Sequence, residues 1–408
     1  MDLQLTPEDV AFRDRVRAWL GANLPRKKLE TQEERKAWHR QMYEAGFIGM
    51  GWPKAYGGQE ARPMEQAIVG AEMARVNAPA PMNGLGIGIV GPTIIHHGTE
   101  EQKREFIQKI LSAEEIWCQL YSEPNAGSDL ASLRTRAERD GDEFVVNGQK
   151  VWTSGGLHSD WGILLARTDP AAPKHQGITC FLVNMHSPGV EVRPLKQISG
   201  SSEFCEVFFD NVRVSADNVV GEMNRGWQIA QTTLSYERGG NLLSRVTRLQ
   251  STFARLLEVA KTLERNGRPA IEDPIVRQRM GQIYSETEVL RYSALRLLSK
   301  LEKGQRPGPE ASIAKLYYSE LDKRAQELMQ EILGPFGQLF AGAPSDLALT
   351  GDEDGEGGSW VHSFVWSRAG TIYAGSNEIQ KNIIGERVLG LPKEVRADRQ
   401  ELKARAAK

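Results

Sequence analysis

The chain of 408 residues carries 51 Lys and Arg against 53 Asp and Glu, which gives a formal net charge of −2. At roughly 100–200 residues per domain, this length predicts about two or three domains, and the near-neutral charge argues against nucleic acid or an anionic membrane as the main partner. The three cysteines, Cys118, Cys180 and Cys205, contain no C-x-x-C pair, which excludes a disulfide framework and a cysteine-built zinc site and fits a reducing compartment.

The N-terminus differs from a secretion signal, because Met1–Gln4 is acidic where a signal peptide is basic, and no apolar core follows. The most apolar stretch, about residues 85–95, contains Gly and Pro and is far shorter than the roughly 20 residues that span a bilayer. We therefore expect a soluble, cytoplasmic protein without a membrane segment.

The first part of the chain, residues 1–118, is predicted to be an all-α domain. Thr6, with Pro7 at the first helical position and Asp9 three residues on, is typical of a capping-box helix start. A second helix is predicted over about residues 31–46. A third begins at Thr99, with Gln102 at the capping-box position.

The second part, residues 119–226, is predicted to be a β domain. Residues 145–151 (VVNGQKV) indicate a hairpin, because Asn-Gly tolerates the positive φ angles of a type I′ turn. Short apolar runs separated by turn residues follow over 161–166, 178–183, 190–195 and 204–214. Their spacing predicts a small antiparallel barrel or sandwich.

Helical periodicity returns in the third part, residues 227–408. Long helices are predicted over about 226–265, 274–303, 309–333 and 361–389, with a Gly- and acid-rich surface loop at 351–358 and a charged tail from Lys393. Strands and helices do not alternate, so a doubly wound sheet is unsupported. The fold class predicted is α+β, with a helical, a β and a second helical domain.

Two sequence patterns look like functional motifs but lack the structural context or the spacing that those functions require. Residues 86–91 (GIGIVG) match the dinucleotide fingerprint, but they lie among helices and precede Pro92, so close helix packing or a pocket lining is the better interpretation. His96 and His97 are adjacent and have no H-x-x-x-H spacing or nearby acidic partner. We expect no metal site.

Three segments are candidates for holding a polar ligand. Residues 119–129 (QLYSEPNAGSD) place hydroxyls and turn amides together, residues 150–156 (KVWTSGG) place an indole beside two hydroxyls, and in residues 368–380 Ser376 is positioned to cap a helix from Asn377. Taken singly, each fits a plain structural role equally well: a β-turn, a core Trp and an ordinary capped helix.

Residues 236–240 (YERGG) lie inside a predicted helix. Two consecutive glycines there cost about 1 kcal/mol each relative to Ala, which is tolerated more readily where something must approach the backbone closely. Glu237–Arg238 by itself indicates an ordinary solvated ion pair.

Taken together, these segments resemble the acyl-CoA dehydrogenase family over almost the whole chain. The most specific stretches, in register, are 122–129, 150–154, 206–214 (EVFFDNVRV), 221–227 and 375–392 (GSNEIQKNIIGERVLGLP). The resemblance implies a helical N-terminal domain, a middle β domain and a C-terminal four-helix bundle, assembled as a homotetramer built from dimers. It also implies FAD between the middle and C-terminal domains.

Site residues follow from the resemblance position by position. Facing the flavin ring it places Tyr121, Ser122, Gly127, Ser128, Trp152, Thr153 and Ser154, and near the adenosine diphosphate portion Ser376 and Glu378. Arg265 and Gly334 match positions that contact FAD of a neighbouring subunit. In that region the chain departs from the family, with Asp273–Pro274 at a usual Gln and residues 331–337 (EILGPFG) in place of Gln-x-x-Gly-Gly-x-Gly. Substrate contacts are implied for Ser128, Tyr236, Arg238 and Gly375.

The catalytic base is the main departure. Many members carry a Glu just before the Gly of the last motif, where this chain has Ala374. Isovaleryl-type and long-chain members instead carry it on the first C-terminal helix before an Arg, which matches Glu237–Arg238. The resemblance thus implies that Glu237 takes the α-proton, that Arg238 orients it, and that the backbone N–H of Ala374 stabilises the thioester oxygen.

The expected function is α,β-desaturation of an acyl-CoA thioester, with an electron-transfer flavoprotein as electron acceptor. Alternatives are a same-fold flavin oxidase of the nitroalkane-oxidase kind, or a subunit with little activity alone in a heteromeric dehydrogenase. The length, branching or ring content of the acyl chain does not follow from the sequence.

Overall fold

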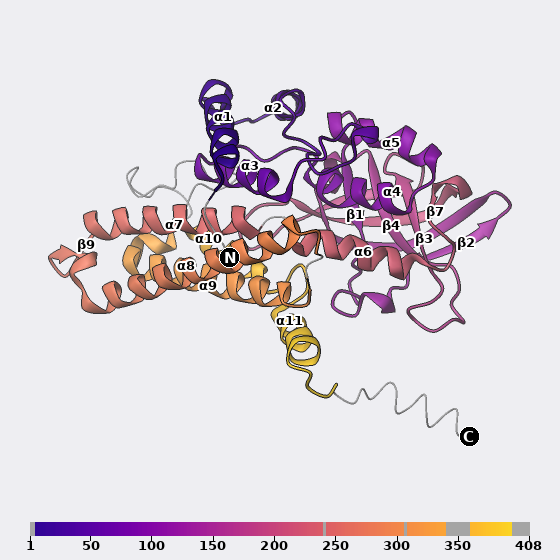
Figure 1. The fold of residues 1–408 in the computed structure, drawn as a ribbon. Coiled ribbons are helices and arrows are strands. Elements are labelled where there is room, and N and C mark those ends of the chain that lie inside the picture. The colour runs from indigo at the N-terminus through magenta and orange to yellow at the C-terminus, as the bar shows by residue number, and fades with distance from the viewer. Residues whose placement is uncertain (1–4, 240–241, 306–307, 340–359, 394–408) are drawn as a thin grey trace, which may run out of the picture.

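The computed structural model describes residues 5–239, 242–305, 308–339 and 360–393. Figure 1 shows a helical N-terminal part packed over one side, a β-sheet at one end and a long helical bundle at the other. This order of elements confirms the predicted α+β fold class. Among the described residues, no helix has both the length and the apolarity needed to cross a membrane.

The N-terminal helices begin at the predicted caps. Thr6, Thr31 and Thr99 each accept a hydrogen bond from the amide of the third helical residue, and the side chain of that residue accepts one from the backbone amide of the cap. The helices are α1 (Pro7–Asn23), α2 (Gln32–Glu44), α3 (Pro63–Arg75), α4 (Gly91–His97) and α5 (Glu100–Ser112).

The glycine-rich segment packs closely between helices, as the sequence indicated. Residues Gly86–Val90 form a π-helix that runs directly into α4, with no strand before it. A Cβ built on Gly91 would lie 2.1 Å from the Trp52 ring, so these glycines allow close packing. They do not form a dinucleotide loop.

The middle part is one sheet with an open path, β6-β7-β3-β2-β4-β5-β8, and β1 beside β4. Its pairs are antiparallel except β1–β4 and β2–β4, which are parallel. Among the described strands the two end strands, β6 and β8, do not pair with each other, so the sheet does not close into a barrel. The strands are β1 (Trp117–Leu120), β2 (Arg136–Asp140), β3 (Glu143–Ser154), β4 (Trp161–Arg167), β5 (Ile178–Asn184), β6 (Val190–Leu195), β7 (Phe204–Ser215) and β8 (Val219–Val220).

The predicted hairpin at Asn147–Gly148 is wrong. Strand β3 runs straight through these residues, with a bulge between Val146 and Gly148 against β7. The Asn147 side chain accepts a hydrogen bond from the Asn211 amide at 2.8 Å, so its polar group links two strands. The hairpin turn instead lies at residues 141–142, between β2 and β3, where Gly141 has φ +63°.

The C-terminal part is the predicted helical bundle. Its elements are α6 (Gly226–Gly239), α7 (Leu242–Thr262), β9 (Glu264–Arg265), β10 (Arg268–Pro269), α8 (Pro274–Glu302), α9 (Ala311–Leu333), α10 (Trp360–Ser367) and α11 (Asn377–Ile383). The loop predicted at 351–358 and almost all of the predicted tail lie outside the described residues.

The single helix predicted over 361–389 is wrong. Helix α10 ends at Ser367 and α11 starts at Asn377. Between them Ala374 and Gly375 take positive φ angles, +53° and +81°, which no α-helix contains, so a continuous helix cannot run through this segment. Ser376 caps α11, as predicted, by accepting a hydrogen bond from the Ile379 amide.

The N-terminal helices and the sheet share an apolar core, and the bundle has a core of its own. One apolar cluster joins the N-terminal helices to a face of the sheet through Phe106, Trp117 and Ile163, and another fills the bundle. Helix α3 packs on α7, and Arg62 just before α3 forms ion pairs with Asp9 of α1 and Glu302 of α8. These contacts fix the N-terminal helices relative to the bundle.

Candidate active site

The first candidate segment is the turn that follows β1. Tyr121 is 4% exposed, and its hydroxyl donates to Oγ1 of Thr233 on α6 at 3.1 Å. The carbonyl of Ser122 accepts a hydrogen bond from the Val151 amide at 2.9 Å, which ties this turn to β3. Gly127 and Ser128 follow in an exposed stretch. The structure thus places the segments at 121–128 and 150–154 side by side.

A buried ion pair holds this turn in place. Nζ of Lys150, a fully buried residue, donates to the Tyr121 carbonyl at 3.0 Å and to Glu123 Oε1 at 2.8 Å. The Glu123 carboxylate also accepts hydrogen bonds from the backbone amides of Arg134 and Thr135, at 2.7 and 2.9 Å. The charged groups are therefore paired and hydrogen-bonded, as burial requires.

Burial dominates the titration of the lysine. It lowers the pKa of Lys150 to about 8, although the Glu123 carboxylate acts in the opposite direction. Burial alone would raise the pKa of Glu123, but the Lys150 ammonium and the two backbone donors outweigh it and the pKa is lowered. At neutral pH both groups are charged.

The end of β3 presents the second candidate segment. Trp152 has φ +61° and is 57% exposed, which is unusual for an indole at the end of a strand. Thr153 is fully buried, and its Oγ1 has no hydrogen-bond partner among the described residues. Ser154, half-buried, pairs with Phe204 of β7. An exposed ring and an unused hydroxyl are what a planar polar ligand needs.

A row of aromatic rings leads from this strand to the bundle. The Trp152 ring meets the edge of Phe204 at 5.9 Å between centroids, and Phe204 stacks on Trp366 of α10 at 5.9 Å and 16°. The contact therefore joins the sheet to the C-terminal segment that carries Ala374.

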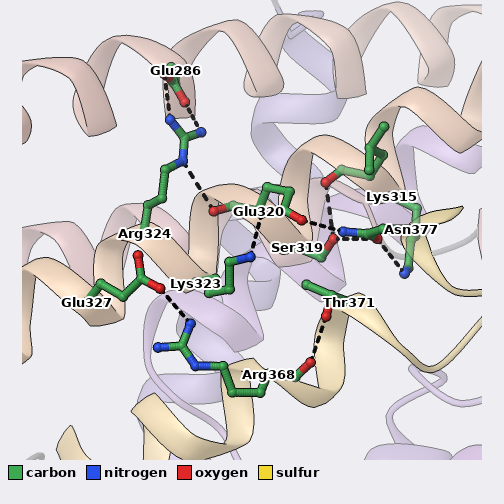
Figure 2. A network of polar contacts seen from close by, with 11 residues as sticks. Glu286, Lys315, Ser319, Glu320, Lys323, Arg324, Glu327, Arg368, Thr371 and Asn377 are labelled. Atoms are coloured by element: carbon green, nitrogen blue, oxygen red, sulfur yellow. Dashed lines mark hydrogen bonds and ion pairs between the residues drawn. The ribbon is translucent and has the colours of Figure 1, made fainter. Parts of the chain in front are cut away.

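That C-terminal segment is anchored on α9 by polar contacts, which Figure 2 shows. Asn377 Oδ1 accepts hydrogen bonds from Lys315 Nζ and Ser319 Oγ, both at 3.0 Å, and its amide donates to Glu320 Oε1 at 2.7 Å. Before the turn, Arg368 pairs with Glu327 at 2.8 Å. The segment from Arg368 to Asn377 is thereby held at both ends.

The first turn of α11 carries the remaining predicted cofactor residues. Ser376 caps the helix and Glu378 is exposed beside it. Hydrogen bonds from its own backbone amide and from the Ser376 hydroxyl lower the pKa of the Glu378 carboxyl.

The predicted base lies on α6. Tyr236, Glu237 and Arg238 are in the last turn of this helix, and their side chains lie outside the described part of the structure, as does Gly240. Glu237 follows Thr233 by four residues, about one helical turn. Thr233 contacts both Tyr121 and Thr93 of α4 at 3.1 Å, so α6 is fixed next to the turn after β1.

Two predicted residues lie elsewhere. Arg265 is in β9 at the end of the bundle remote from the sheet (Figure 1). Gly334, with φ +55°, ends α9, about 22 Å along that helix from Ser319. The structure does not bring these two residues to the site formed by the sheet and α11 of the same chain.

The described residues hold no group of three or more His, Cys, Asp or Glu side chains arranged for a metal ion. His96 and His97 contact each other edge to face at 4.5 Å, and His97 shares a 3.1 Å contact with the Thr232 hydroxyl. All three cysteines are buried and free.

Family models, related proteins and solved structures all indicate the same family. The chain matches the N-terminal, middle and C-terminal domain models of acyl-CoA dehydrogenases over residues 6–114, 118–212 and 224–389. Acyl-CoA dehydrogenase IpdE1 of Mycobacterium tuberculosis is 39% identical over 397 residues, 94% of this chain and 98% of that protein. Its namesake in Mycolicibacterium smegmatis is 40% identical over 407 residues, with the same two shares covered.

Solved structures agree. A chain of the ChsE4–ChsE5 complex from Mycobacterium tuberculosis is 32% identical, with a TM-score of 0.82, covering 97% of this chain and 100% of that one. A chain of the Tcur3481–Tcur3483 steroid ACAD is 30% identical, also with a TM-score of 0.82 and the same coverage. The family models and these relatives therefore define an oxidoreductase that acts on CH–CH groups. This chain belongs to the acyl-CoA dehydrogenase family, whose members are flavoproteins.

Sequence reasoning included Lys150, Asn377 and Gln380 in its candidate segments but did not identify them as the residues that hold the site in place. The signal for Lys150 was present, because Phe144, Val146 and Lys150 share one face of β3 at a period of two and that face is buried. A lysine at an inward position requires a buried partner, and Glu123 supplies it. Nothing local to Asn377 or Gln380 indicated their partners.

Proposed function

We propose that the chain desaturates an acyl-CoA thioester between the α and β carbons, with Glu237 as the base. The observation that carries the proposal is Ala374. It occupies the turn between α10 and α11 that the family uses for its more common base, and its methyl group cannot take a proton. Glu237 on α6 is the carboxylate that matches the other family arrangement, and the Tyr121–Thr233 contact fixes that helix beside the turn after β1.

Ala374 retains one function without its side chain. A backbone N–H aimed at the thioester oxygen stabilises the negative charge that develops as the α-proton leaves. Glu237 would remove that proton, and Arg238 would orient the carboxylate.

FAD is the cofactor we propose, and the residues present fit it. Trp152 offers an exposed ring, Thr153 a buried hydroxyl without a partner among the described residues, and a Cβ on Gly127 would meet nothing within 4 Å. Ser122, Ser128, Ser154, Ser376 and Glu378 would supply polar contacts, and a neighbouring chain would supply Arg265 and Gly334. Bound flavin provides the acceptor for the β-hydrogen. An electron-transfer flavoprotein would then accept the electrons.

For the substrate we propose a bulky, polycyclic acyl group, and for the assembly a tetramer containing a second kind of subunit. Two similar structures support this: one is a steroid ACAD, and both are named as pairs of different chains. The altered segment at residues 331–337, where a neighbouring chain's flavin would bind, also favours a division of labour between unlike subunits.

Glu237→Gln tests the reaction. The variant is expected to remain folded and yellow and to lose dye reduction with an acyl-CoA panel that includes steroid-derived thioesters. Turnover at the wild-type rate would refute Glu237 as base. Oxygen consumption with peroxide release by the wild type would instead identify a flavin oxidase. Native mass spectrometry of the chain, alone and co-expressed with a second family member, tests the assembly.

A further inference from the structure

The turn that carries Ala374 adopts a conformation that must be held. Ala374 and Gly375 have consecutive positive φ angles of +53° and +81°. For a residue with a side chain the left-handed region is sterically unfavourable, so Ala374 stays there only if neighbouring groups impose it.

Gln380 is the group in contact with this turn. Its Nε2 donates to the Ala374 carbonyl at 3.2 Å and to the Gly375 carbonyl at 2.9 Å. The residue is 1% exposed, and its Oε1 has no hydrogen-bond partner among the described residues. A side-chain amide nitrogen has two hydrogens, so one Gln380 satisfies both carbonyls at once.

Gly375 is shaped to this contact. A Cβ at that position would lie 2.6 Å from Nε2 of Gln380, a distance that real Cβ atoms do not adopt. Gly375 is therefore required both for its φ angle and for the approach of the amide.

The helix that carries Gln380 is itself fixed. Asn377, three residues earlier and 2% exposed, is bonded to Lys315, Ser319 and Glu320 of α9. Its contacts appear in Figure 2. Gln380 thus holds the turn from a helix that is anchored to the bundle.

We propose that Gln380 is a positioning residue for the reaction. By binding the carbonyls of Ala374 and Gly375 it holds the φ and ψ angles of Ala374. These angles set the direction of the Ala374 N–H, which lies in the preceding peptide, toward the thioester oxygen. This inference rests on the function proposed above, since it assigns a reason for the geometry of that N–H.

The test uses the Glu237→Gln holoenzyme, in which a thioester is not consumed. Affinities are measured for hexanoyl-CoA and for S-hexyl-CoA, the thioether that lacks the carbonyl. The six-carbon chain is chosen because a short chain fits both a narrow and a wide acyl pocket. We expect the thioester to bind at least about tenfold more tightly. Adding Gln380→Met should reduce that ratio below about threefold while thioether affinity changes less than about twofold.

Gln326→Met is the matched control, because Gln326 is a buried glutamine of α9 whose amide approaches Asp322 and not the turn. Gly375→Ala, which displaces the amide from the other side, should lower the ratio like Gln380→Met. Hydrogen exchange of residues 372–376, measured without ligand, should rise at least about tenfold in Gln380→Met and stay unchanged in Gln326→Met.

The outcomes separate the two proposals. An unchanged affinity ratio and unchanged exchange in Gln380→Met overturn the role of Gln380 and leave the proposed function intact. If the Glu237→Gln enzyme binds both ligands equally, or binds neither of them nor a steroid-derived acyl-CoA, the proposed function fails and the assignment of Gln380 to it fails as well. Faster exchange with an unchanged ratio makes Gln380 purely structural and also overturns the proposal.

Discussion

Replacing Lys150 by Met isolates the contribution of the buried ion pair to stability. Met matches the length of the lysine stem and removes only the ammonium, which lies 3.0 Å from the Tyr121 carbonyl and 2.8 Å from Glu123. The variant leaves the Glu123 carboxylate buried with its two backbone donors and without its cation.

The expected loss at pH 7.5 is about 3 kcal/mol. Removing one partner from a buried pair typically costs about 3–5 kcal/mol. The remaining backbone donors to Glu123 and the removal of a buried ammonium place this case at the lower end of that range.

The loss should increase with pH. Burial lowers the pKa of Lys150 to about 8 in the folded protein, against 10.5 for an ordinary lysine. Between these values the unfolded chain binds more protons at this position, so the stability of the wild type rises relative to Met by about 1.4 kcal/mol per pH unit. From pH 8 to pH 9.5 the difference should grow by about 2 kcal/mol.

Urea unfolding of the two proteins, followed by tryptophan fluorescence, measures these differences. Lys174→Met is the control, since Lys174 pairs with the exposed Asp129 on the neighbouring turn and its loss should cost less than about 1 kcal/mol at either pH. If Lys150→Met is no more costly than Lys174→Met, or if its cost falls as pH rises, the reasoning on the buried pair is wrong.

Three further predictions test other parts of the structure. In the Glu237→Gln protein, Ala374→Glu should restore part of the desaturase activity, measured by dye reduction; no recovery would argue against two interchangeable base positions. Thr99→Ala removes the hydroxyl that accepts the Gln102 amide, while the Thr99 amide can still donate to the Gln102 side chain; it should lower the free energy of unfolding by about 1 kcal/mol, measured by urea denaturation. Because burial raises the pKa of the Cys118 thiol to about 12, iodoacetamide at pH 8 should leave Cys118 unmodified in the folded protein, and rapid alkylation seen by mass spectrometry would contradict its burial.

Elements defined by local chemistry could be predicted from the sequence. The Thr6 and Thr99 caps and the strand runs at 161–166 and 178–183 all appear in the structure, because caps and continuous apolar runs depend on residues close in the chain. The resemblance to the family brought together the segments around Tyr121 and Trp152.

The failures occurred where distant contacts decide local structure. Asn147–Gly148 has the letters of a turn, but Asn211 of β7 bonds its side chain, and Gly148 packs against Thr135, where a Cβ would lie 2.5 Å away. The role of Gln380 depends on the positive φ angles of Ala374 and Gly375, which no spacing of residues reveals.

The position of Arg265 at the end of the bundle remote from the sheet has a genetic consequence. If that end completes the flavin site of a neighbouring chain, each catalytic centre is formed by residues of two polypeptides. Inactivating changes at Glu237 and at Arg265 would then complement each other on co-expression. A mixed dimer contains one chain with each change. One of its two centres then has both altered residues and the other has neither, so about half of the centres in mixed dimers are intact.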